Sequence, residues 1–309
     1  MKKRYELPLA RYLAAAILIG SCAFVPAIFS DVSAHSKVDS LRQEEKKKTE
    51  NEKDQKQKGD EKEPLPQLTE AQAITEFAII GYGGRKALEA ARASIQEEGT
   101  IRLATDQGDI TGSYTMRSIR QEKSWQDLLR VDLELTPPEE AQRQGAPTSI
   151  KYVAAFNGAT VWSAQNDQYI NPRPEVVAAF RAQLTHDFST LLRYKEDGSK
   201  VEVVGPETIT GIDTVALDLT TPDGEKTRYW ISKKFYRVVR LEYELKLSDE
   251  QPATKYRISY FYTPHRVVQN TLVPSRRVTM QDDKFVQEVT LTNVNYSAKL
   301  DPQIFQHLP

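Results

Sequence analysis

The stretch Leu129-Arg130-Val131-Asp132-Leu133-Glu134-Leu135 decides the fold of this chain. Apolar and charged side chains alternate through all seven residues, and successive side chains of a β-strand point to opposite faces. The pattern therefore predicts a strand with one apolar face and one solvated face. Strands of that kind are typical of antiparallel sheets.

The same period of two recurs on both sides of this stretch. Apolar residues stand two positions apart in five further segments: Ile101 and Leu103, Tyr114 and Met116, Val215 to Leu219, Leu241 to Leu247, and Tyr256 to Tyr262. Asn157-Gly158 is a strong signal for a hairpin. We count ten or eleven strands, and the order of elements shows no strand–helix–strand rhythm, which argues against a parallel sheet.

Two regions show helical patterns. Thr69 and Gln72 suit a capping box at the start of a helix, which Gly81–Gly84 interrupts before a second helix runs to about Ile95. Pro174 opens another helix, predicted to continue to about Tyr194. Residues 137–147 are rich in turn-forming residues and predict a connection.

These elements predict an α+β fold, in which a large curved antiparallel sheet forms a half-open β-barrel covered by helices. A sheet of this size with one apolar face must curl and be covered. The space between sheet and helices is either an apolar ligand cavity or a core filled by its own side chains. The residue pattern leaves both possibilities open.

Composition excludes several classes of protein. The 309 residues include 42 Lys+Arg and 43 Asp+Glu, a net charge of −1, so the basic excess typical of nucleic-acid-binding proteins is missing. The one cysteine, Cys22, lies in the N-terminal segment described next. The rest of the chain therefore has no disulfide framework, thiolate metal site or cysteine nucleophile.

Residues 1–34 resemble an export signal. Lys2, Lys3, Arg4 and Arg11 precede the uncharged run Leu13–Phe29, and Val32-Ser33-Ala34 forms a small-residue cleavage site before His35. Cleavage between Ala34 and His35 is the favoured interpretation. Retention as an N-terminal membrane anchor and lipidation at Cys22 are the alternatives.

Residues 35–66 predict a disordered charged linker. Eighteen of these 32 residues are charged, nine of each sign, and few sizeable apolar side chains interrupt them. Such a segment buries too little apolar surface to offset the entropy of ordering. Residues 67–309 then form the folded domain, which is long enough for a single substantial core.

Catalytic motifs are missing from the sequence. It contains neither the His-Glu-x-x-His of a zinc protease nor the Gly-x-Ser-x-Gly of a serine hydrolase. His186 is predicted to lie at the edge of the core, and the pairs Lys233-Lys234 and Arg276-Arg277 on solvated strand edges or turns. We therefore expect no enzyme activity, no catalytic residue, no metal and no cofactor.

Four stretches resemble the LolA-like family of lipoprotein-sorting and carrier proteins. They are Ile80–Leu88 with its Gly-Gly pair, Leu191–Gly211 with its Gly-x-Glu-x-Ile-x-Gly continuation, Tyr229–Arg240 with its strand–turn–strand, and the closing Val294–Phe305. A serine, Ser232, stands where aspartate is commoner in the family. Order and spacing, more than any single stretch, carry the resemblance.

The resemblance implies a half-open barrel in the periplasm or cell envelope that holds lipid or lipoprotein acyl chains without covalent chemistry. Envelope proteins are possible partners, nucleic acid is not, and an uncleaved N-terminal segment would add membrane contact. The alternative is an envelope sensor or structural module with a filled core. The residues expected to line the apolar concavity are Val131, Leu133, Tyr152, Phe180, Phe188, Tyr243, Ile258 and Tyr260.

Overall fold

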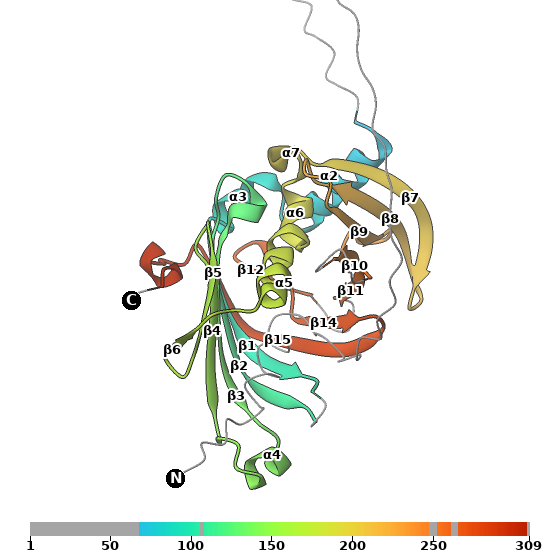
Figure 1. Ribbon diagram of the computed structural model, residues 1–309. Helices are drawn as coiled ribbons and strands as arrows, with labels where there is room; N and C mark the ends of the chain where they lie inside the picture. Colours follow the sequence, from blue (N-terminus) through green and yellow to red (C-terminus); the bar gives the residue numbers. More distant parts are fainter. Residues whose placement is uncertain (1–67, 106–107, 247–251, 261–264, 308–309) are drawn as a thin grey trace, which may run out of the picture. The chain divides into compact units, whose positions relative to one another are not determined.

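Thirteen antiparallel strands form one sheet in the computed structural model, which describes residues 68–105, 108–246, 252–260 and 265–307 (Figure 1). The strands follow the order β6-β5-β4-β3-β2-β1-β15-β14-β11-β10-β9-β8-β7. Their bounds are β1 (Ser94–Leu103), β2 (Ile110–Ile119), β3 (Leu128–Thr136), β4 (Ile150–Phe156), β5 (Val161–Gln165), β6 (Gln168–Ile170), β7 (Lys200–Ile209), β8 (Ile212–Thr220), β9 (Lys226–Ser232), β10 (Val238–Leu245), β11 (Thr254–Ser259), β14 (Arg276–Gln281) and β15 (Lys284–Tyr296). A separate hairpin joins β12 (His265–Val268) and β13 (Thr271–Pro274).

The first and last strands of the domain meet in the middle of the sheet. Ile95 of β1 lies opposite Tyr296 of β15, and from this seam the chain runs outward in two arms. One arm ends at β6 and the other at β7, and these two edge strands do not pair with each other. The sheet is therefore open, and the expected α+β fold with a half-open antiparallel barrel is confirmed.

Helices occupy the space between the two arms. Figure 1 shows α5 and α6 between the arm that ends at β6 and the arm that ends at β7. The helices are α2 (Glu70–Gly81), α3 (Arg85–Ala91), α4 (Glu139–Arg143), α5 (Pro174–Thr185), α6 (Phe188–Leu192) and α7 (Tyr194–Asp197), with 3₁₀ turns η1 (Ser124–Gln126) and η2 (Pro302–Phe305). None of the helices in the described ranges is long and apolar enough to cross a membrane.

Strand β3 has the two faces that its sequence predicts. Leu129, Val131, Leu133 and Leu135 are all buried, whereas Glu134 is exposed. The capping box at α2 is also confirmed, since Thr69 Oγ1 accepts from the Gln72 amide at 3.3 Å and Gln72 Oε1 accepts from the Thr69 amide at 3.0 Å.

The long helix predicted from Pro174 to about Tyr194 is wrong in its extent. It ends at Thr185, and Asp187 starts α6 by accepting a hydrogen bond from the Ser189 amide at 3.1 Å. Aspartate is a favoured N-cap residue, so it begins a new helix more readily than it continues an old one.

Three further predictions need correction. The helix expected to run to about Ile95 ends at Ala91, because β1 begins at Ser94, and the turn-rich stretch 137–147 contains α4. The described residues form fifteen strands rather than ten or eleven. Strands as short as β6, β12 and β13 contain too few residues for a period of two to be recognised.

The N-terminal predictions lie outside the described residues. These are the signal segment with Cys22, the cleavage site at Ala34 and His35, and the charged linker 35–66. All of them stay predictions.

Candidate functional site

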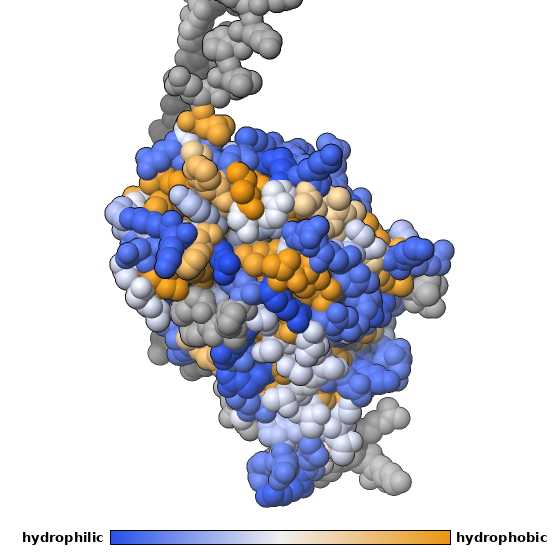
Figure 2. Space-filling model, turned by 180° about the vertical axis from the view of Figure 1, so that it is seen from behind, coloured by the Kyte–Doolittle hydropathy of each residue, from blue (hydrophilic) through white to orange (hydrophobic). Residues whose placement is uncertain are grey.

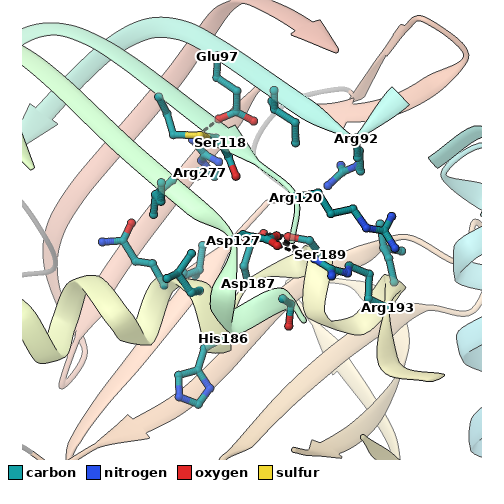
Figure 3. Close-up of a pocket in the computed structure, with 18 of the residues that line it drawn as sticks. Arg92, Glu97, Ser118, Arg120, Asp127, His186, Asp187, Ser189, Arg193 and Arg277 are labelled. Atoms are coloured by element: carbon teal, nitrogen blue, oxygen red, sulfur yellow. Dashed lines mark hydrogen bonds and ion pairs between the residues drawn. The ribbon is translucent and has the colours of Figure 1, made fainter. Parts of the chain in front are cut away.

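A cavity of about 170 Å³ lies between the sheet and its helical cover (Figure 3). Strands β1, β2 and β3 contribute to it from one arm, and β11, β14 and β15 contribute from the seam and the other arm. Helix α3, the end of α5, and α6 with the residues that follow it line the remaining sides. The cavity thus occupies the position where the sequence left open either a void or a filled core.

Part of the cavity wall is aliphatic. Met116 of β2 lies opposite Val131 of β3 in the sheet, and both point inward because the period of two places them on the same face. The apolar lining comprises Leu88, Ile95, Ile101, Met116, Leu129, Val131, Leu184, Leu192 and Ile258, with the rings of Tyr114 and Tyr260.

An ion pair bridges the seam of the sheet at the cavity wall. Arg277 Nη2 of β14 lies 2.8 Å from Glu97 Oε2 of β1 and donates to Tyr114 Oη at 3.0 Å. Burial alone would lower the pKa of Arg277, but Glu97 together with Tyr114, Tyr260 and Asp187 outweighs burial, and the pKa is raised. The guanidinium therefore stays charged inside the cavity.

A second ion pair fastens the helical cover to the sheet. Arg193, which follows α6, places Nη1 2.8 and 2.9 Å from the two carboxylate oxygens of Asp127. Its Nη2 donates to the carbonyl oxygens of Gln121 at 2.7 Å and Glu122 at 3.0 Å. Burial raises the pKa of Asp127 to about 6, against the opposing effect of Arg193. We call this set of contacts the Arg193 clamp.

The end of the helical cover adds two contacts to the same connection between β2 and β3, and in one of them Lys123 Nζ donates to the carbonyl oxygen of Glu196. The Ser124 amide of η1 donates to Asp197 Oδ1 at 3.0 Å, and Asp197 is buried at the end of α7. Residues 193–197 are therefore held against residues 121–127 by contacts in which each segment contributes side chains. Any widening of the cavity on this side must break them.

Arg92 and Arg120 bring positive charge to the cavity wall and form no direct ion pair within the described ranges, although the charge of Arg120 acts on the Asp127 carboxylate. The Arg120 amide donates to the carbonyl oxygen of Ala93 at 3.0 Å, which brings Arg120 next to Arg92, and Figure 3 shows both side chains on the same side of the cavity. Arg92 lies over the rings of Phe188 and Tyr296, 5.4 and 5.5 Å from their centroids. Guanidinium groups placed this way can bind a carboxylate or phosphate.

His186 is a buried neutral residue of the cavity wall. Its ring stacks on Tyr243 with centroids 4.2 Å apart, and its Nδ1 shares a hydrogen bond of 2.7 Å with Thr227 Oγ1. Burial lowers the pKa of His186 to about 4, against the opposing charge of Asp223. The side chain therefore packs in the core at neutral pH, which is the role the sequence predicts.

The eight residues predicted to line the concavity separate into two groups. Val131, Ile258 and Tyr260 line the cavity. The other five are buried in the surrounding core without lining it: Leu133, Tyr152, Phe180, Phe188 and Tyr243. Their part in ligand binding stays a prediction.

Sequence reasoning missed the arginines of the site. Arg277 was expected on a solvated edge, but it lines the cavity beside Glu97. A signal was present in β1, where the period of two places Glu97 on the same face as Ile95 and Ile101. A charge on an otherwise apolar face needs a partner, yet a partner 180 positions away cannot be identified from local spacing.

Comparisons with known proteins give likenesses in structure only. No family model matches the sequence, and no curated protein matches it. A DUF1329 family protein from Desulfovibrio piger matches with a TM-score of 0.51 at 12% identity, over 77% of this chain and 97% of that one.

Two further solved structures match at lower TM-scores. A LolA superfamily protein from Nitrosomonas europaea matches with a TM-score of 0.48 at 16% identity, over 78% of this chain and 99% of that one. A putative outer membrane lipoprotein-sorting protein domain from Vibrio parahaemolyticus matches with a TM-score of 0.47 at 13% identity, over 76% of this chain and 97% of that one.

The fold is LolA-like. The open antiparallel sheet with helices between its arms is the architecture that the LolA-like resemblance of the sequence implied. At such low identity the likeness concerns the fold alone, and one fold can serve several functions. Function must therefore be argued from the cavity.

Proposed function

We propose that this chain is an exported envelope protein that binds lipid, or the acyl chains of lipoproteins, and carries them without covalent chemistry. The observation that carries the proposal is the cavity of about 170 Å³ between the sheet and its helices. Its wall combines aliphatic and tyrosine side chains with many charged and polar groups. Apolar surface with placed polar groups is the usual form of a ligand site, and this mixture suits an amphipathic ligand.

The volume of the cavity sets the length of chain it holds. A cavity of about 150 Å³ accommodates benzene, so 170 Å³ corresponds to about six carbon atoms. At about 0.8 kcal/mol per buried methylene, six of them contribute about 5 kcal/mol, a dissociation constant on the order of 10⁻⁴ M. Binding of that strength suits a carrier that must release its ligand, and a longer chain requires the helical cover to move.

Arg92 and Arg120 give the proposed ligand a polarity. Both lie at the cavity wall, and neither forms a direct ion pair in the part of the chain that the structure describes, although the charge of Arg120 acts on Asp127. An acyl chain among Met116, Val131 and Ile258 would leave a carboxylate or phosphate end within reach of these guanidinium groups. The proposed ligand is therefore amphipathic and anionic.

Export follows from the N-terminal sequence rather than from the cavity. The signal-like residues 1–34 and the charged linker 35–66 support a location in the periplasm or cell envelope, where the domain would be free after cleavage or tethered to the inner membrane if the segment is retained. Donors and acceptors of the ligand would then be other envelope proteins or lipoproteins.

Native mass spectrometry of the full chain after gentle extraction tests this function. We expect added mass from co-purifying lipid, and binding of a fluorescent fatty acid to the delipidated protein. Met116→Trp should fill the cavity and abolish both. Thr115→Trp, on the opposite face of β2, is the matched control and should retain both. Ligand retained by Met116→Trp would contradict binding in this cavity.

A sensor or structural interaction module of the envelope is the second candidate function. The observation in its favour is the packed core around the cavity, where Leu133, Tyr152, Phe180, Phe188 and Tyr243 are buried against neighbouring side chains. A clean unliganded mass, together with no binding of fatty acid by the delipidated protein, would support this module over the carrier.

A further inference from the structure

An exposed apolar patch lies where α2 ends. Phe77 and Ile80 are 49% and 64% exposed, and they share one face of α2 because they are three residues apart. Phe235, at the turn between β9 and β10, is 53% exposed. Figure 2 shows the rear face of the molecule, where apolar surface gathers in the upper half among hydrophilic side chains.

Contacts hold these residues together. The ring of Phe77 lies 5.0 Å from that of Tyr236, and a Cβ atom on Gly81 would lie 3.4 Å from the carbonyl oxygen of Phe235. The end of α2 therefore packs directly against the β9–β10 turn. We call Phe77, Ile80 and Phe235 the apolar patch.

The β12–β13 hairpin extends the exposed apolar surface. The Leu272 amide donates to the carbonyl oxygen of Tyr82 at 3.2 Å, which joins the hairpin to the residue that follows α2. Val267, opposite Leu272 in the hairpin, is 71% exposed. Exposed apolar residues thus come from three elements around one helix end, whereas single exposed apolar residues need no explanation.

Positive charge surrounds Phe235. Lys234 Nζ lies 5.1 Å and the Arg237 guanidinium 5.3 Å from the centre of its ring, and Lys233 precedes them in the same exposed turn. None of these three cations forms an ion pair within residues 68–105, 108–246, 252–260 and 265–307.

Acidic groups beside the patch do not cancel this charge. Asp213 lies near the turn, since the Lys233 amide donates to its carbonyl oxygen at 2.9 Å. Glu76 of α2 is already paired, 2.8 Å from Arg85 and 2.6 Å from Lys195. Three cations against Asp213 leave the turn positively charged.

We propose that this surface docks on an anionic lipid bilayer, with Phe77, Ile80 and Phe235 entering the interface and Lys233, Lys234 and Arg237 binding lipid headgroups. Apolar side chains flanked by Lys and Arg match the apolar interior and negative surface of such a membrane. A second copy of this chain is a poorer match, because two positively charged turns repel each other.

Docking here would bring the cavity close to lipid. Gly83 and Gly84 join the apolar patch to α3, and Leu88 of α3 and Arg92, which follows it, line the cavity. This consequence rests on the proposed carrier function, but docking itself does not, since it needs no occupied cavity. The two proposals can therefore fail separately.

A fluorescence experiment on the full chain tests the docking. Phe235→Cys in a Cys22→Ser background is labelled with bimane, and vesicles carry phosphatidylcholine with brominated acyl chains and about 30% phosphatidylglycerol. We expect quenching at position 235, which requires contact with the acyl region. Tyr169→Cys in the same background is the matched control, because Tyr169 is 52% exposed on β6, the opposite edge strand, and should not be quenched.

Charge variants complete the test. At about 1 kcal/mol for each lysine near an anionic surface, Lys233→Gln/Lys234→Gln should weaken partitioning roughly 25-fold. Lys151→Gln/Lys299→Gln removes the same charge from exposed positions outside the patch and should have little effect. No quenching at position 235, equal quenching at both labelled positions, or equal weakening by both charge variants would overturn the proposal. A dimer that Phe235→Ser abolishes would overturn it as well, and would assign the surface to a second copy.

Discussion

His186 of the cavity wall makes the stability of the folded protein depend on pH. Folding lowers the pKa of His186 from 6.5 to about 4, mainly because the ring is buried. Between these two values the unfolded chain binds a proton that the folded protein excludes. Stability from this residue is therefore complete above pH 6.5 and is lost as the pH falls toward 4. Burial also lowers the pKa of His265 to about 4, with the same sign.

We predict that acidification destabilises the protein through His186. Between pH 7 and pH 5 its contribution to the free energy of unfolding should fall by about 2 kcal/mol. Urea denaturation of the wild type and of His186→Gln at both pH values measures this contribution as the difference between their pH dependences. The comparison is needed because the raised pKa of Asp127 acts in the opposite direction. Parallel pH dependences of the two proteins would contradict the prediction.

The residue scale is where the sequence was least informative about the site. The period of two predicted correctly that Val131 and Ile258 face inward, because that pattern is local. The partners of Glu97 and Asp127 are Arg277 and Arg193, far away along the chain. Spacing cannot identify such pairs, since they depend on which strands and helices become neighbours.

At the scale of elements, β1 and β2 contain glycines that allow close strand contact. A Cβ atom on Gly99 would lie 2.1 Å from the carbonyl oxygen of Thr290, and one on Gly112 would lie 2.1 Å from that of Glu134. Gly99 also follows a register shift between β1 and β15. Irregularities of this kind bend and twist strands, so they contribute to the curvature that makes room for the helices.

We predict that Gly99→Ala lowers the free energy of unfolding by about 1–3 kcal/mol, the usual range for overpacking a filled site. The added methyl group meets main chain, which cannot rotate away. Thr100→Ala, an exposed neighbour in the same strand, should change stability by less than about 0.5 kcal/mol. Urea denaturation of both variants measures the effect, and equal losses would show that the close contact is not its cause.

The Arg193 clamp leads to a second prediction for these elements. Arg193→Ala should lower the free energy of unfolding by about 3–5 kcal/mol, because it leaves the half-buried Asp127 without the cation that pairs with it. Arg193→Ala/Asp127→Asn should recover part of this loss, since the unpaired charge is then gone. A double-mutant cycle measured by urea denaturation checks the coupling, and strictly additive single losses would argue against it.

Elements were predicted well where their sequence signals are local. The alternation in residues 129–135, the capping box at Thr69 and the Asn157-Gly158 turn all depend on neighbours in the chain. The predicted helix from Pro174 was too long because the capping side chain of Asp187 competed with a continuous apolar stripe. The cavity itself could not be predicted, since its volume is what remains after distant side chains have packed.

At the scale of the whole molecule, the proposed carrier must bind acyl chains that are longer than its cavity can hold. We predict that the affinity for straight-chain fatty acids keeps rising beyond eight carbons, by about fourfold per methylene at first. Chains longer than about six carbons should also speed hydrogen exchange in residues 188–197, because the cover must leave the sheet. Calorimetry from hexanoate to hexadecanoate, with Met116→Trp as the control, measures the affinity. A plateau at about eight carbons would indicate a rigid pocket rather than an acyl carrier.

The seam between β1 and β15 has a consequence for biogenesis. Ile95 pairs with Tyr296, so the central strands of the sheet cannot pair until almost the entire polypeptide has been synthesised. Pairing between strands so far apart in the chain forms slowly, because the entropy of closing the loop must be overcome first. Until β15 pairs, both β1 and β14 present unprotected main-chain edges to other molecules. Premature termination before residue 284 would therefore remove β15 and leave one chain with two unjoined half-sheets, each with an unpaired edge strand, instead of one slightly shortened domain.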